Sequence, residues 1–135
     1  MFHFQPRARA VALSLGILAL AACATEFHAP VSGVIGEQRA QGQSTARIDG
    51  NGTFFVETVS GLRCEGTYDA LDINPTIRAK ATCNDGRSGT LLITRNISRG
   101  TGTAIGRLND GTDARFVFGD ISFAEAFGDS AARTN

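Results

Sequence analysis

Two alternating segments around a pair of cysteines constrain the fold of this chain more than any other feature. Every second position in both segments is apolar or small: Leu62, Cys64, Gly66 and Tyr68, then Ile77, Ala79, Ala81 and Cys83. Folding the chain back at residues 73–74 places Cys64 opposite Cys83 and gathers these side chains on one face. A slip of one residue would turn all of them to the other face, so the pattern specifies its own register. The two segments therefore predict an antiparallel hairpin with one buried face.

This register also predicts which other residues of the hairpin face each other. The expected cross-strand pairs are Gly66 with Ala81, Tyr68 with Ala79, Ala70 with Ile77, Glu65 with Thr82 and Asp69 with Arg78. Pro75 prevents an ideal two-residue turn. We therefore expect a wider loop between the two strands.

Turn dipeptides recur along the rest of the chain. Asp-Gly occurs at 49–50, 85–86 and 110–111, and Asn-Gly at 51–52, and both pairs tolerate the positive φ of tight hairpin turns. No segment after Cys23 keeps apolar residues at helical spacing for more than about one turn. We expect about eight short strands, at residues 31–36, 44–48, 53–59, 62–69, 77–83, 89–95, 102–108 and 114–119. The sequence thus predicts an all-β fold, a small antiparallel barrel or sandwich built from hairpins.

A second hairpin is predicted around residues 110–111. Its expected pairs are Ile105 with Phe116 and Thr103 with Phe118. The opposite face of its first strand then carries only glycine and alanine, at positions 102, 104 and 106.

Residues 1–23 have the pattern of a bacterial lipoprotein signal. The first ten include Arg7 and Arg9 and no acid, the next ten are mostly apolar, and two alanines precede Cys23. The apolar stretch is too short to span a bilayer as a stable helix. Removal of residues 1–22 would leave Cys23 as a lipidated N-terminus. Ordinary secretory cleavage after Ala21 is the alternative, and it would leave the Cys23 thiol free.

The expected domain organisation follows from this signal and the strand pattern. Residues 1–22 are the signal peptide, 23–34 the lipidated N-terminus and a short tether, 35–121 the β-domain, and 122–135 a polar C-terminal tail. The signal resembles that of bacterial lipoproteins, and in the enterobacterial sorting rule an aspartate after the cysteine retains a lipoprotein at the inner membrane. Ala24 occupies that position here. We therefore expect a lipid anchor in the outer membrane, with the domain facing the periplasm.

Export also bears on the two remaining cysteines. Oxidising compartments favour disulfides, and opposite positions on one hairpin bring Cys64 and Cys83 within bonding reach. A thiol or metal site is the alternative, but the sequence lacks a C-x-x-C spacing and a histidine near either cysteine. We predict one disulfide, Cys64–Cys83, and no metal site.

Composition and motifs argue against nucleic-acid binding, cofactor binding and catalysis. Without Arg7 and Arg9, which leave with the signal, the mature chain has 11 basic and 13 acidic residues, and neither sign is clustered. This charge distribution gives no attraction to nucleic acid. The glycines of 100–106 lack the dinucleotide-binding spacing, and G-K-[ST] is absent, so we expect no cofactor. His28, expected in the solvated tether, is the sole histidine after the signal. Because nucleophilic triads need a histidine within the domain, we predict no catalytic residues and no enzyme.

Four short motifs together resemble a pattern in small, uncharacterised proteobacterial lipoproteins. They are CEGTY at 64–68, CNDGRSG at 83–89, GTG at 100–102 and FVFG at 116–119. The likeness covers roughly the last half of the mature chain and consists of turn and disulfide motifs. It implies the β-fold and the envelope compartment, and it carries no activity over to this chain.

Two functional hypotheses follow from the sequence. The first is a non-catalytic envelope lipoprotein, held at the membrane by its lipid, whose β-domain is structural or binds an envelope protein partner. The alternative is a lipid-tethered inhibitor of a periplasmic or secreted hydrolase, with a hairpin tip such as residues 96–100 as the inhibitory loop. Small lipoproteins that inhibit proteases or lysozymes are similar in size and in their barrel-like pattern.

Overall fold

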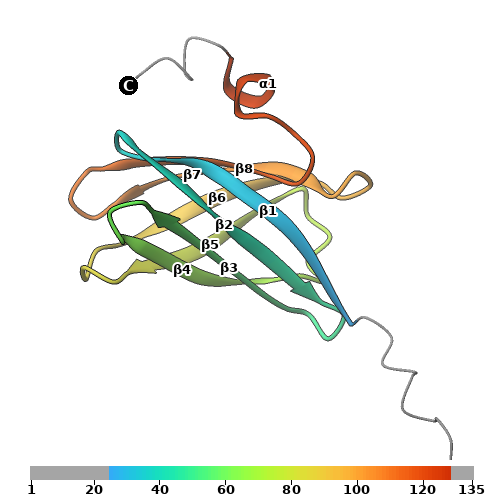
Figure 1. The fold of residues 1–135 in the computed structure, drawn as a ribbon. Helices are drawn as coiled ribbons and strands as arrows, with labels where there is room; N and C mark the ends of the chain where they lie inside the picture. Colours follow the sequence, from blue (N-terminus) through green and yellow to red (C-terminus); the bar gives the residue numbers. More distant parts are fainter. Residues whose placement is uncertain (1–24, 129–135) are drawn as a thin grey trace, which may run out of the picture.

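Eight antiparallel strands close into a barrel in the computed structural model, which describes residues 25–128 (Figure 1). The strands are β1 (Glu26–Ile35), β2 (Gln38–Arg47), β3 (Asn51–Thr58), β4 (Arg63–Asp69), β5 (Thr76–Cys83), β6 (Ser88–Asn96), β7 (Thr101–Leu108) and β8 (Asp113–Phe118), followed by a short helix, α1 (Phe123–Phe127). Each strand pairs with the next, and β1 pairs with β8 to complete the circle. The predicted all-β fold of about eight strands is confirmed. Of the two predicted architectures, barrel and sandwich, the protein forms the barrel.

The alternation of side chains decides which face of each strand is buried. In β5 every second residue is buried and the residues between them are exposed. The core is therefore the barrel interior, and it includes Val31, Ile35, Val56, Ile77, Leu91, Ile93, Leu108 and Phe116. Glycines make room for the largest rings. A Cβ on Gly66 would overlap the Phe54 ring, and a Cβ on Gly102 would overlap the Phe118 ring.

The barrel has two different ends, which we call the turn rim and the loop rim. The turn rim carries the β1–β2, β3–β4, β5–β6 and β7–β8 connections and lies at the left in Figure 1. The loop rim carries the start of β1, the β2–β3 and β6–β7 turns, and the β4–β5 loop of residues 70–75, and it lies at the right. The chain therefore enters the barrel at the loop rim.

The register predicted for the cysteine hairpin is confirmed at its turn-rim end. Cys64 pairs with Cys83, and the two following pairs, Glu65 with Thr82 and Gly66 with Ala81, also match. The pairs predicted beyond this point, including Tyr68 with Ala79, are not formed in the sheet, because β4 and β5 separate after Gly66. The six-residue loop that contains Pro75 is wide, as expected.

The register predicted for the second hairpin is wrong by one residue. Phe116 pairs with Ala104, not with Ile105, and Phe118 pairs with Gly102. The connection 109–112 is longer than a two-residue turn: the amide of Leu108 donates to the carbonyl of Thr112 at 2.8 Å. The slip places Ile105 on the outer face, 42% exposed, and turns the glycine and alanine stripe inward against the phenylalanine rings.

The barrel begins earlier in the sequence than predicted. Most of the expected tether belongs to β1, which pairs with β2 from Glu26 onwards. The first half of this strand is mostly exposed, so the apolar alternation that reveals a strand is weak there. Pro30 is tolerated because it lies just before the first β1–β8 pair, at Val31, and its bond to that side uses its carbonyl, which accepts from the amide of Gly119 at 3.0 Å.

Part of the expected polar tail forms α1 beside β8. Ser122 caps this helix: its hydroxyl accepts from the amide of Glu125, and the Glu125 carboxylate accepts from the amide of Ser122. The guanidinium of Arg115 lies 5.6 and 5.7 Å from the ring centres of Phe123 and Phe127. These contacts order a segment whose composition is typical of a frayed end. Between residues 25 and 128, no helix has the length and hydropathy needed to cross a membrane.

Candidate functional site

The inward-facing side chains do not fill the barrel completely. They leave a cavity of about 80 Å³, roughly half of the ~150 Å³ of an engineered apolar cavity that binds benzene. Most of the lining is aliphatic or aromatic, and includes Val31, Val56, Leu91, Ile93 and Phe116. Three polar side chains also line it, namely Ser44, Tyr68 and Arg95. The cavity is therefore apolar, with a small number of polar groups that can fix the orientation of a ligand.

Tyr68 and Arg95 belong to the part of the wall where β4 and β5 separate. Residues 64–66 pair with 81–83 at three positions, whereas β5 and β6 pair at seven. Tyr68 lies beyond the last of the three and pairs only with Gly52 of β3. The hydrogen bonding between β4 and β5 is thus incomplete on the side of the loop rim.

Arg95 holds the β4–β5 loop in place on this side. Its Nη2 donates to the main-chain carbonyl oxygens of Asp72, at 2.5 Å, and Asn74, at 2.7 Å. Its main-chain amide donates to the carbonyl of Pro75 at 2.7 Å. Within residues 25–128, the Nε of Arg95 is the buried side-chain polar atom that has no hydrogen-bond partner. A buried donor without an acceptor costs about 1–3 kcal/mol, so an acceptor brought within reach of this Nε would remove that cost.

The other two polar groups bind each other. The hydroxyls of Ser44 and Tyr68 are 2.9 Å apart, and the Tyr68 ring lies 6.5 Å from the ring of Phe54, centre to centre. Among residues 25–128, those that line the cavity include no histidine and no carboxylate. The described lining is therefore apolar with one cationic side chain, Arg95, an arrangement that suits ligand binding.

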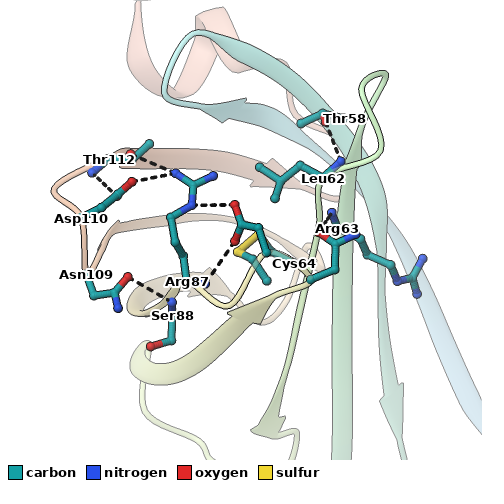
Figure 2. A network of polar contacts seen from close by, with 12 residues as sticks. Thr58, Leu62, Arg63, Cys64, Arg87, Ser88, Asn109, Asp110 and Thr112 are labelled. Atoms are coloured by element: carbon teal, nitrogen blue, oxygen red, sulfur yellow. Dashed lines mark hydrogen bonds and ion pairs between the residues drawn. A yellow bond between two sulfur atoms is a disulfide. The ribbon is translucent and has the colours of Figure 1, made fainter.

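Polar contacts tie together the opposite, turn rim (Figure 2). The Arg87 guanidinium lies between two carboxylates, with Nε 2.8 Å from Asp85 Oδ2 and Nη1 2.9 Å from Asp110 Oδ2. The same Nη1 donates to the hydroxyl of Thr112 at 3.2 Å. These contacts join the β5–β6 turn to the β7–β8 turn, next to the Cys64–Cys83 disulfide that joins β4 to β5.

Hydrogen bonds lower the pKa values of both carboxylates in this network. The Thr112 amide, the Thr112 side chain and Arg87 together lower the pKa of Asp110 to about 2. The Arg87 amide is the main cause of the lowered pKa of Asp85, and its guanidinium adds to the effect. In return, Asp110 and then Asp85 raise the pKa of Arg87.

We expect the Asp110 network to stabilise the fold at neutral pH and to fail in acid. A carboxyl whose pKa is lowered by folding contributes stability above its unfolded value of ~3.9, and loses it as pH falls towards the folded value. Asp110→Asn removes the charge, so the melting temperatures of the variant and the wild type should differ at pH 7 and converge as pH falls from about 4 to 2. Asp120→Asn, at an exposed aspartate outside the network, is the control. A difference that persists at the lowest pH would contradict the assignment.

The residues singled out from the sequence lie in different parts of the structure. Cys64 and Cys83 form the predicted disulfide, with an S–S distance of 2.00 Å. Cys23, the predicted lipidation site, lies outside the described residues. His28 is exposed, as expected, but it lies in β1 and not in a tether, and its Nδ1 is 3.0 Å from the hydroxyl of Thr45.

The hairpin tip proposed for an inhibitor is a compact turn. The amide of Gly100 donates to the carbonyl of Asn96 at 2.9 Å, and the hydroxyl of Ser98 donates to the Asn96 side chain at 2.8 Å. The turn therefore bonds its own polar groups, and Ile97 is left 60% exposed.

Sequence reasoning missed the polar groups of the cavity. Arg95 follows Leu91 and Ile93 at the same alternating positions of one strand, so its charge falls where the pattern calls for an apolar side chain. That departure from alternation could have identified Arg95 as unusual, but the sequence does not show that β4 and β5 separate beside it. Tyr68 lies on the apolar face, as its position in the alternation predicts.

Comparison of this chain with protein-family models, with curated proteins and with solved structures finds no match.

Proposed function

We propose that the protein is a membrane-anchored lipoprotein of the bacterial envelope whose barrel is a non-catalytic binding module for a small ligand with an apolar chain and an anionic head. The anchor is Cys23, in the outer membrane, with the barrel in the periplasm. The observation that carries the binding role is an apolar cavity whose lining includes Arg95, a side chain with a buried Nε that has no hydrogen-bond partner among the described residues. An acceptor bound there would remove the cost of leaving this donor unpaired.

The cavity indicates the class of ligand. About 80 Å³ admits a few carbon atoms and not a long acyl chain or a ring system with large substituents. The cationic nitrogen favours an anionic head, because charge-assisted hydrogen bonds are stronger than neutral ones. The best fit is a short alkyl chain that ends in a carboxylate or a similar anion.

Two other function classes fit less well. An enzyme would need a base beside its nucleophile. The hydroxyls of Ser44 and Tyr68 bind each other, and the described residues that line their cavity include no histidine or carboxylate. A hydrolase inhibitor would use the turn at 96–100, whose main-chain groups already bond within the turn. An envelope protein partner at the barrel exterior is compatible with the binding module.

The anchor is tested by Cys23→Ser in cells labelled with a fatty-acid probe. The serine hydroxyl is much less nucleophilic than a thiolate, so we expect an unlabelled precursor that retains its signal. A wild-type chain without label, or a labelled variant, would refute the lipid anchor.

The cavity is tested by titrating the protein with straight-chain carboxylates of increasing length, by calorimetry or by chemical-shift changes. Each added methylene that enters the cavity should tighten binding about fourfold, at ~0.8 kcal/mol per methylene, until the cavity is full. Alcohols of the same lengths should bind more weakly, because they offer Arg95 no charge.

A matched pair of substitutions makes the result specific to the interior. Ala81 faces the cavity, so Ala81→Leu should shorten the chain length at which affinity stops rising. Thr82 is the next residue and is exposed on the outer face, so Thr82→Leu should leave the series unchanged. Binding in the cavity would be refuted if affinity did not change with chain length. It would also be refuted if Thr82→Leu changed the affinities as much as Ala81→Leu does.

A further inference from the structure

Exposed apolar side chains gather at one end of the barrel. Eight large apolar residues are exposed within the described chain, and five of them lie at the loop rim: Phe27, Ile48, Leu71, Ile73 and Ile97. Ile105 and Leu92 lie on the outer wall, and Val59 alone lies at the turn rim. Single exposed apolar residues are ordinary, but a gathering of this kind at one end marks an interaction surface.

The β2–β3 turn and the β4–β5 loop, which carry three of these residues, are held against each other. The amide of Ala70 donates to the carbonyl of Gly50 at 2.8 Å. A Cβ on Gly50 would lie 3.2 Å from Cδ1 of Leu71, which places that side chain against the turn. Arg95 fixes the same loop through its bonds to Asp72 and Asn74. The surface therefore belongs to rigid connections.

The chain enters the barrel at this same rim. The amide of Ile48 donates to the carbonyl of Thr25 at 3.1 Å, which ties the start of the described chain to the β2–β3 turn. Cys23 precedes Glu26 by three residues. Three residues span at most about 11 Å when fully extended. A lipid on Cys23 would therefore hold the loop rim close to the bilayer surface.

We infer that the loop rim rests on the lipid bilayer, with Phe27, Ile48, Leu71, Ile73 and Ile97 in the interfacial region. This inference rests on the proposed lipid anchor, which sets the end of the barrel that meets the membrane. Arg95, which lines the cavity and bonds the β4–β5 loop, then lies on the side of the barrel that faces the bilayer.

The charges at the rim indicate that this contact is apolar and not electrostatic. Acidic side chains lie among the apolar ones and serve as turn acceptors: Asp49 accepts from the amide of Asn51, and Asp69 from the amide of Leu71. Arg47 is paired with Glu26 at 2.7 Å. Arg99 is exposed in the β6–β7 turn of the same rim. Within the described residues the rim therefore carries isolated arginines among carboxylates and no basic cluster for anionic headgroups, and we expect the contact to be independent of anionic lipid and of salt.

The absence of tryptophan from the sequence gives a clean experiment. Ile73→Trp and Ile97→Trp each place one indole at the loop rim, and Val59→Trp places one at the turn rim. The parent residues are 84%, 60% and 105% exposed, so none of the substitutions disturbs the core. The full chain, processed and lipidated in a bacterial host, is reconstituted into phosphatidylethanolamine vesicles with brominated acyl chains, with and without phosphatidylglycerol.

We expect strong fluorescence quenching and a blue shift for both loop-rim variants, consistent with an indole roughly 5–10 Å into the headgroup and acyl boundary. The Val59→Trp variant should emit as in water, and phosphatidylglycerol or salt should change none of the three. Equal quenching at both rims, or none at either, would overturn the docking. A blue shift at the loop rim without quenching would mean that protein covers this surface, a second copy or a partner, and would also overturn it.

Mass spectrometry of Cys23 in the same samples separates this inference from the proposed function. A lipidated protein with an unquenched loop rim refutes the docking and leaves the anchor standing. An unmodified Cys23 refutes the anchor, and the quenching then decides by itself whether the rim binds lipid. Thermal melting by circular dichroism confirms that each variant is folded as the wild type is.

Discussion

Replacing Phe116 by alanine should destabilise the barrel by about 3–5 kcal/mol, at least as much as removal of the disulfide. The Phe116 side chain is 3% exposed and belongs to the core. It also lines the cavity, so its removal would enlarge a space that is already unfilled. The cost therefore combines the lost transfer free energy of the ring with the loss of its packing contacts. Urea denaturation of the mature chain, followed by circular dichroism, measures it.

Phe55→Ala is the matched control. Phe55 lies on the outer face of β3, half-buried, with the guanidinium of Arg63 4.1 Å from the centre of its ring. Removing this ring should cost only about 1 kcal/mol, since the cation–π contact is solvent-accessible and no core space is created. If the two variants lost similar stability, the assignment of inner and outer faces would be wrong.

Removing the disulfide should have the next largest effect. The double variant Cys64→Ala and Cys83→Ala should lose about 3 kcal/mol of unfolding free energy, because the bond between residues 19 apart no longer restricts the unfolded chain. For a domain of this size, that loss corresponds to a melting temperature lower by roughly 10–20 °C. The effect should be large because the bond joins β4 to β5, the seam that pairs at only three positions.

Reduction supplies the control for this prediction. Dithiothreitol should lower the melting temperature of the wild-type protein to nearly that of the double variant, and it should leave the double variant unchanged. A wild-type protein insensitive to reductant under conditions that release both thiols would show that β4 and β5 stay together without the bond.

Local pattern is sufficient wherever alternation is strong and a turn is short. The cysteine hairpin specifies its own register from Cys64 to Gly66, because a slip would expose every apolar residue. The start of β1 escapes prediction because its exposed residues alternate weakly. The predicted Phe116 register is wrong by one residue because the length of a turn depends on its backbone bonds, which the sequence does not display.

The presence of about eight short antiparallel strands built from hairpins and the pairing of Cys64 with Cys83 can be read from the amino-acid sequence. These features depend on neighbours in the chain, or on pairs joined by one connection. The folded sheet was needed to establish that β1 closes on β8, that β4 and β5 separate beyond Gly66, and that Arg95 reaches the loop between them. The closure of the barrel and the separation of β4 from β5 depend on how the twist, tilt and stagger of all eight strands combine in one closed sheet. That is a property of the whole sheet, and no single hairpin carries it.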